Sequence, residues 1–121
     1  MSGWTWLAVA LLGGAGASAR FLLDALISAR ARGDFPLGTL AVNTSGSLLL
    51  GLLAGLSVTA DALVLAGTAT LGSYTTFSTW MLETQRLAED ARARVAAANV
   101  LLSLLVGVGA AALGRSIGAH V

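Results

Sequence analysis

The hydrophobic pattern divides the chain into four long apolar segments joined by short polar connections. These segments cover about residues 4–28, 36–58, 62–82 and 95–114. Each is close to the ~20 apolar residues that a helix needs to cross a bilayer. The pattern therefore predicts an all-α membrane protein in which residues 1–121 form a single unit of four transmembrane helices. An even number of crossings places both chain ends on the same side of the membrane.

The third segment departs from this apolar pattern near its middle, where hydroxyl side chains gather after Gly72. Lipid offers a hydroxyl group no partner at that depth, so these groups should face protein or a water-filled path. Either they bond carbonyl groups one turn earlier in the helix, or a glycine-permitted break opens a site that holds an ion. Phe77 and Trp80, three residues apart, share a helix face. The hydroxyl residues are Ser73, Tyr74, Thr75, Thr76, Ser78 and Thr79.

The first segment has an aromatic start and a charged pair near its end. Trp4 and Trp6 suit the membrane interface. Because no basic region precedes them, we expect this segment to be retained as a span and not removed as a signal peptide. Arg20 and Asp24 lie four residues apart on one helix face. They form either an ion pair at the membrane edge or, for Arg20, a vestibule cation that attracts anions.

Polar residues in and beside the other spans need partners as well. Asn43 is costly in an apolar helix unless its amide bonds another helix or donates to an anion. Asn99 and Ser103, four residues apart, form a stripe that is either one wall of a polar path or a helix-packing seam. Glu83 and Arg86 are interpreted as a solvated pair where the third segment leaves the membrane.

Composition supports a membrane protein and excludes several functions. The chain is 56% hydrophobic and 11% charged, against about 25% charged residues in a soluble domain. The absence of cysteine excludes disulfides and thiol chemistry, and one histidine cannot form a His-rich metal site. A net charge of +1 gives no support for nucleic-acid binding. No nucleophile, acid–base pair or nucleotide-binding loop is evident, so the sequence does not predict an enzyme.

Arginine residues are distributed unevenly between the two sides of the predicted membrane. Five lie in or beside the first and third connections, and only Arg115 lies clearly on the side of the termini. By the positive-inside rule, the termini then face outward. The five are Arg30, Arg32, Arg86, Arg92 and Arg94.

Several stretches, in order and over nearly the whole chain, resemble the Fluc (CrcB) family of fluoride-specific ion channels. The run Gly-Ser-Tyr-Thr-Thr-Phe-Ser-Thr in the third of four spans is the most specific of them. The resemblance implies a multi-pass protein of the bacterial plasma membrane that exports fluoride passively and limits its toxicity. The matching stretches are residues 13–21, 36–47 and 72–79, followed by Glu83, Asn99 and Ser103.

The resemblance also implies an assembly and a set of site residues. The assembly is an antiparallel dimer in the lipid bilayer, either a homodimer or a heterodimer with a paralogous subunit, with a central structural sodium ion. The main-chain carbonyls of Gly72 and Thr75 match the sodium ligands. The pore positions match Asn43, Thr76, Phe77, Thr79, Trp80 and Ser103; Arg20 and Glu83 match the vestibule, and Asn99, Ser103 and Gly107 a polar track.

Two departures and one alternative accompany this resemblance. Trp80 stands where the family usually has a second phenylalanine, and Gly107 lacks the usual hydroxyl. The uneven arginines predict a preferred orientation with an oppositely biased partner, the alternative being a homodimer. The competing function is a small dual-topology multidrug or cation exporter. Such exporters use a carboxylate within the first span, where this chain has only Asp24, near the end. A third interpretation, a structural membrane subunit, leaves the hydroxyl cluster without a purpose.

Overall fold

The computed structural model describes residues 1–121 and contains helices without strands. Three helices are uninterrupted: α1 (Gly3–Arg30), α2 (Leu37–Leu56) and α6 (Ala93–Ala119). Each of these is long and apolar enough to cross a membrane. Between α2 and α6 the chain makes its remaining crossing in pieces, so the predicted all-α multi-pass fold with a broken third helix is confirmed. The pieces are α3 (Ala60–Ala62), η1 (Leu63–Leu71), α4 (Gly72–Tyr74) and α5 (Ser78–Glu89).

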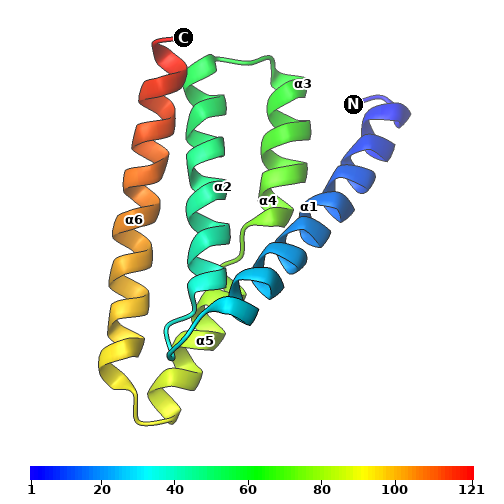
Figure 1. Ribbon diagram of the computed structural model, residues 1–121. Coiled ribbons are helices and arrows are strands. Elements are labelled where there is room, and N and C mark those ends of the chain that lie inside the picture. Colours follow the sequence, from blue (N-terminus) through cyan, green and yellow to red (C-terminus); the bar gives the residue numbers. More distant parts are fainter.

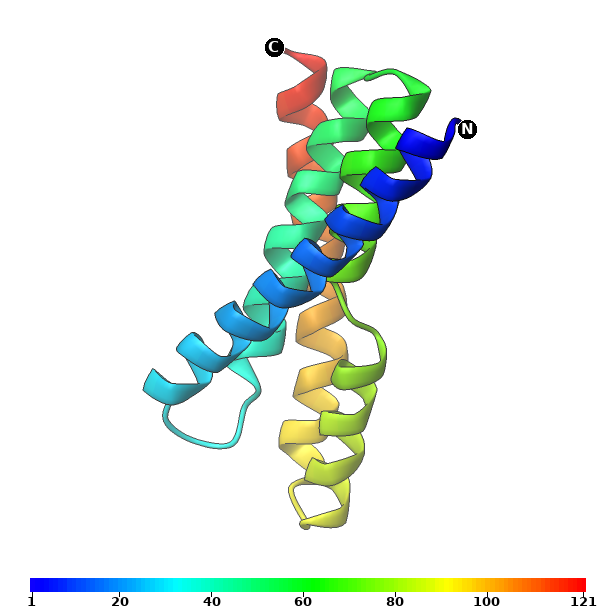
Figure 2. The ribbon, with the colours of Figure 1, turned by 90° about the vertical axis from the view of Figure 1, so that its right-hand side faces the viewer.

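The helices run up and down, so that both termini lie at one end of the bundle (Figure 1). The α1–α2 and α5–α6 connections lie at the opposite end. Asp34 of the first connection forms an ion pair there with Arg92 of the second. Helix α1 crosses the other helices obliquely (Figure 2) and does not contact α6. The cavity described below therefore lies among α2, the broken crossing and α6.

Helices α2 and α6 pack closely because glycines remove side chains from their contact. A Cβ atom added to Gly114 would collide with the carbonyl oxygen of Leu48, and one added to Gly51 would collide with that of Ala111. Small residues allow membrane helices to approach in this way, since lipid tails compete equally for larger apolar side chains. Helices α2 and α6 consequently form a closely packed pair, whereas the first half of the broken crossing packs mainly against α1.

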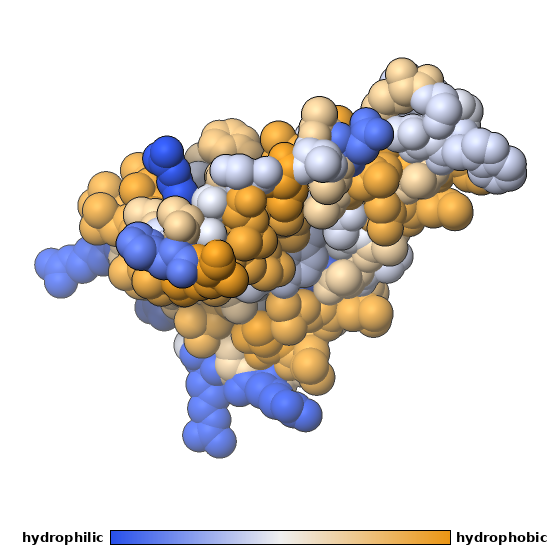
Figure 3. Space-filling model, turned by 90° about the horizontal axis from the view of Figure 1, so that it is seen from above, coloured by the Kyte–Doolittle hydropathy of each residue, from blue (hydrophilic) through white to orange (hydrophobic).

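Large apolar side chains point mainly outward, as expected for a bundle surrounded by lipid. The few buried apolar residues are mostly small, whereas Trp4 is 82% exposed and Leu105 is 71% exposed. Seen from the end that carries the termini, apolar side chains cover most of the flanks and hydrophilic ones project separately (Figure 3). A soluble protein would hide this apolar surface from water.

Two helices continue past the ends of the predicted spans. Helix α5 continues beyond Leu82 to Glu89, and α6 continues past residue 114 to Ala119. Hydropathy marks only the apolar part of a helix, whereas polar residues such as Gln85 and Arg86 are themselves good helix formers. The helices therefore extend beyond the segments that hydropathy detects.

Candidate functional site

The third crossing is broken at residues 75–77, a few residues after the glycine that was predicted to interrupt it. Gly72 is helical, with φ −63° and ψ −35°, whereas Thr75 is extended, with φ −81° and ψ 159°. The prediction that Gly72 itself interrupts the helix is therefore wrong. The segment before the break is also irregular, since η1 has the wider π-helical turn, a form that is rare and often found at functional sites.

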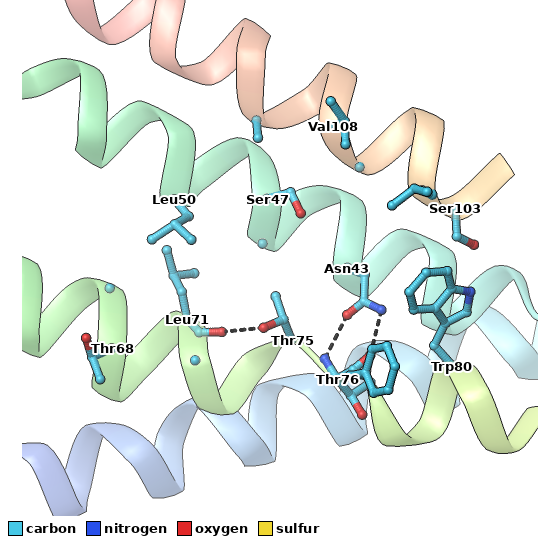
Figure 4. Close-up of a pocket in the computed structure, with 17 residues that line it drawn as sticks. Asn43, Ser47, Leu50, Thr68, Leu71, Thr75, Thr76, Trp80, Ser103 and Val108 are labelled. Atoms are coloured by element: carbon cyan, nitrogen blue, oxygen red, sulfur yellow. Dashed lines mark hydrogen bonds between the residues drawn. The ribbon is translucent and has the colours of Figure 1, made fainter. Parts of the chain in front are cut away.

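The break is held open by the side chain of Asn43 on α2. Its Nδ2 donates to the carbonyl oxygen of Thr76 at 2.8 Å, and its Oδ1 accepts from the Thr76 N–H, also at 2.8 Å (Figure 4). The carboxamide thus occupies both main-chain groups that would otherwise continue the helical ladder. Asn43 therefore makes the interhelical hydrogen bonds that were one of its two predicted roles, and one N–H of its amide group is still uncommitted.

The hydroxyl groups around the break are largely bonded within the chain. Thr75 donates to the carbonyl oxygen of Leu71 at 3.0 Å, one turn earlier, as the first alternative predicts for such residues. The Thr76 hydroxyl accepts the N–H of Thr79 at 3.1 Å and also donates to the Thr79 hydroxyl, at 3.1 Å. The hydroxyl cluster therefore ends one helix and caps the start of α5, a structural role that accompanies any role in binding.

A cavity of about 590 Å³ opens beside the break, among α2, η1, α4, α5 and α6. No side chain that lines it carries a charge, and a few amide and hydroxyl groups lie among a mainly apolar lining (Figure 4). The cavity brings together most of the predicted pore and sodium positions. They are Asn43, Gly72, Thr75, Thr76, Phe77, Trp80 and Ser103.

Two aromatic rings form one wall of this cavity. The rings of Phe77 and Trp80 have centroids 5.7 Å apart and an interplanar angle of 88°, so one ring presents its edge to the face of the other. The Phe77 side chain is 70% exposed. Because the rim of an aromatic ring is electropositive, an exposed ring edge in an otherwise uncharged cavity offers weak stabilisation to a small anion.

Arg20 lies against the broken helix and not in the cavity. Its Nε donates to the carbonyl oxygen of Ser73 at 3.4 Å. The predicted ion pair with Asp24 is wrong, because Asp24 instead accepts a hydrogen bond from Ser28 at 3.1 Å. The guanidinium of Arg20 thus stabilises the carboxyl end of α4, where main-chain carbonyls lack helical partners.

Glu83 is likewise outside the cavity. Its Oε1 accepts a hydrogen bond of 2.5 Å from the Thr39 hydroxyl of α2. The predicted pair with Arg86 is wrong, since the structure has no ion pair between them. Glu83 and Arg86 instead lie around a smaller hollow of about 240 Å³ at the end that carries the connections. Glu83 therefore ties α5 to α2 below the break.

Asn99 and Thr79 do not line the cavity, but neighbours of Asn99 along α6 do. Asn99 is buried between α5 and α6, with 1% of its side chain exposed. Its bonds to α5 are those of a packing seam. Ser103 and Gly107, at successive turns of α6, do face the cavity. The stripe seen in the sequence is thus a seam at one end and a cavity wall at the other.

Two further polar residues of the cavity wall were not predicted as site residues from the sequence. Ser47 lies one turn after Asn43 on α2, and Thr68 lies in η1. The signal for Ser47 was present, because residues at i and i+4 share a helix face. Thr68 gave no such signal, since the π-helical turn of η1 changes the spacing of side chains along the face.

Main-chain carbonyl groups at the break are available to a ligand. The N–H of Thr76 bonds Asn43 and that of Thr79 bonds the Thr76 hydroxyl, so neither N–H reaches the carbonyl oxygens of Gly72 or Thr75. Those oxygens accept no hydrogen bond from the chain. Oxygen ligands of this kind suit a hard cation, and unwound helix segments in membrane proteins coordinate Na⁺ through such carbonyls.

Comparison with known proteins now decides the family. Residues 7–115 match the family model described as CrcB-like protein, Camphor Resistance (CrcB). This chain belongs to the CrcB family. The CrcB-family chain is 53% identical over 112 residues to a protein of Mycolicibacterium paratuberculosis named Fluoride-specific ion channel FluC 2, covering 93% of this chain and 92% of that protein.

A more distant relative covers the CrcB-family chain equally well. It is a protein of Symbiobacterium thermophilum named Fluoride-specific ion channel FluC 1, 43% identical over 120 residues, with 94% of this chain and 97% of the relative covered. The match therefore includes all four crossings and the residues around the cavity. The resemblance noted from the sequence is confirmed at the level of the family.

Proposed function

We propose that this chain is a subunit of a fluoride-specific channel that lets fluoride leave a bacterial cell passively and limits its toxicity. The observation that carries the proposal is the uncharged cavity at the break, where the Phe77–Trp80 ring pair and Asn43 lie together. The names of the relatives from two bacterial genera support the same ion.

The chemistry of the cavity favours passive flow of a small anion. Ring edges are weak donors, and hydroxyl groups such as those of Ser47 and Ser103 can replace the water molecules around an ion in steps. Several weak sites allow an ion to leave, as conduction requires. A proton-coupled exporter would need a titratable group in contact with its substrate, and the cavity wall has none. This argues against the competing exporter.

A bound Na⁺ would support the break. Its ligands would be the carbonyl oxygens of Gly72 and Thr75, which accept no hydrogen bond from the chain. The positive charge of such an ion would stabilise carbonyl groups that the interrupted helix leaves without partners. In this proposal Na⁺ is structural and is not transported.

The test is fluoride efflux from vesicles that contain the purified protein, followed with a fluoride electrode. We expect efflux that does not depend on a proton gradient and that is absent for chloride. Replacing Na⁺ by N-methylglucamine on both sides should reduce the flux if Na⁺ is structural. Proton-coupled uptake of a cationic drug, without fluoride efflux, would instead establish the exporter.

We further propose that the chain inserts in one orientation and pairs with an oppositely oriented paralogous subunit. The α1–α2 and α5–α6 connections lie at the end of the bundle opposite the termini (Figure 1). Arg30 ends α1, and Arg32 and Arg92 lie in these two connections. Positive residues are retained on the cytoplasmic side. A chain that inserted both ways would need a more even distribution of these charges.

Single cysteines can report this orientation because the chain has none of its own. Ser2→Cys and Ala29→Cys place an exposed thiol near each end of α1, and a membrane-impermeant maleimide added to cells should label only the first. Equal labelling of both sites, together with robust fluoride efflux from the chain expressed alone, would establish a homodimer that inserts both ways.

A further inference from the structure

Helices α5 and α6 are joined by a closed set of hydrogen bonds centred on Asn99. The Asn99 Nδ2 donates to the Thr84 hydroxyl at 2.8 Å, and that hydroxyl donates to the carbonyl oxygen of Trp80, also at 2.8 Å. The indole Nε1 of Trp80 in turn donates to the main-chain carbonyl oxygen of Asn99 at 3.1 Å. Three residues from two helices therefore fix one another in a ring of bonds, called here the Asn99 latch.

The latch determines how the Trp80 ring faces the cavity. Trp80 lines the cavity, but its only polar side-chain atom is bonded to α6 and points away from Asn43 (Figure 4). The side that remains beside Phe77 is carbon only, in the edge-to-face arrangement described above. An indole without this anchor would be free to turn its N–H, a strong donor, toward an ion in the cavity.

We propose that the Asn99 side chain is a positioning residue for the aromatic wall: its bonds to Thr84 and to the main chain of Trp80 keep α5 against α6, so that the indole N–H stays on the main-chain carbonyl of residue 99 and is turned away from the cavity. This inference rests on the proposed channel function for its effect on flux, but not for its effect on the indole. Asn99 itself does not touch the ion, because it is buried between the helices and does not line the cavity.

The reason why this affects flux is that a strong donor would hold fluoride where weak donors release it. Conduction needs sites that are strong enough to admit the ion and weak enough to let it leave. A tethered indole presents only carbon-bound ring atoms to the cavity and therefore acts as a weak site. A loosened indole would bind the ion more strongly or obstruct its path, and either outcome slows passage.

The first experiment measures the indole directly. In a channel that carries Trp4→Phe and Trp6→Phe, Trp80 is the only tryptophan. Asn99→Ala in this background keeps the main-chain carbonyl that accepts the indole N–H but removes the side-chain bonds to Thr84 and to the Trp80 main chain. It should therefore loosen α5 against α6 and make Trp80 fluorescence more accessible to acrylamide, by about twofold in the quenching constant. Gln85→Ala is the matched control, because it removes an exposed amide of α5 that bonds only Glu89, and it should leave quenching unchanged. Unchanged quenching in Asn99→Ala would overturn the proposal, whether or not the protein conducts fluoride.

The second experiment separates positioning from direct contact with the ion. With Trp80 present, Asn99→Ala should lower fluoride efflux about tenfold, as expected from the loss of one or two buried hydrogen bonds. With Trp80→Phe, whose ring needs no N–H anchor, the same change should cost less than about threefold, because residues that act through one another are not additive. A loss of equal size in both backgrounds would show that Asn99 affects flux by a route other than the indole, such as its bond with Ser103, and would overturn the proposal.

Discussion

Asn43→Ala is expected to lower fluoride efflux by about 100-fold and the free energy of unfolding by about 2–4 kcal/mol, because a buried polar group left without a partner costs about 1–3 kcal/mol. The substitution leaves both the N–H and the carbonyl oxygen of Thr76 without the bonds that hold the break open. The main chain near Thr76 can then return toward a continuous helix, which would close the cavity. Efflux from vesicles and thermal unfolding in detergent measure the two effects.

The neighbouring residue supplies a matched control. Thr44 carries a buried hydroxyl that has no hydrogen-bond partner. Thr44→Val replaces that hydroxyl with a methyl group of similar size, so it should leave efflux unchanged and keep or slightly raise the unfolding temperature. If Asn43→Ala behaved like Thr44→Val in both measurements, the two hydrogen bonds between Asn43 and Thr76 would have no part in forming the site.

Phe77→Ile is expected to reduce fluoride efflux at least about 100-fold, equivalent to about 2.7 kcal/mol in the barrier to passage. Isoleucine keeps the apolar character of the side chain but has no electropositive rim. The change also removes the ring that packs edge-to-face against Trp80. Because the Phe77 side chain is 70% exposed, its loss should have little effect on the stability of the subunit.

Phe21→Ile is the matched control for this change. Phe21 is 69% exposed on α1, almost the same fraction as Phe77, and does not line the cavity. It should leave efflux near the value of the unchanged protein. Normal efflux in Phe77→Ile would remove this ring from the path of the ion, whereas an equal loss in both variants would indicate a general requirement for aromatic residues in folding or assembly.

Much of the fold could be predicted because bilayer thickness restricts what a hydrophobic sequence can do. Runs of about 20 apolar residues leave few alternatives to a spanning helix, and α1, α2 and α6 follow the predicted spans. The hydroxyl-rich stretch also gave a usable signal, since polar groups at membrane depth require protein or water. The break in the third crossing was therefore expected before its geometry was known.

The partners of the polar side chains could not be predicted, because spacing along one helix does not reveal which helix lies opposite. Arg20 and Asp24 have the spacing of an ion pair, yet Arg20 bonds the main chain of Ser73 and Asp24 bonds Ser28. Glu83 similarly bonds Thr39 of α2 instead of Arg86. Arg20 and Glu83 thus bond residues of other crossings, which spacing cannot reveal, and Asp24 bonds a residue one turn further along its own helix.

The position of the break could not be predicted for the same reason: it depends on a partner from another helix. Gly72 is the residue that can most easily leave a helix, and conformational freedom alone points to it. The structure instead places the break where a side chain from α2 competes for main-chain groups, and Asn43 reaches Thr76 but not Gly72. The residue pattern within a single segment cannot reveal this interaction with another helix.

Because the break depends on a carboxamide from another helix, the residue that determines the break does not belong to the broken helix itself. Position 72 tolerates a methyl group, for which the nearest obstacle is the carbonyl oxygen of Gly67 at 3.7 Å. Position 43 does not tolerate such a change, because only its carboxamide bonds the main chain of Thr76, 33 residues away. An engineer who wished to install or erase this kink in a related helical bundle would therefore edit the neighbouring helix and leave the kinked one alone.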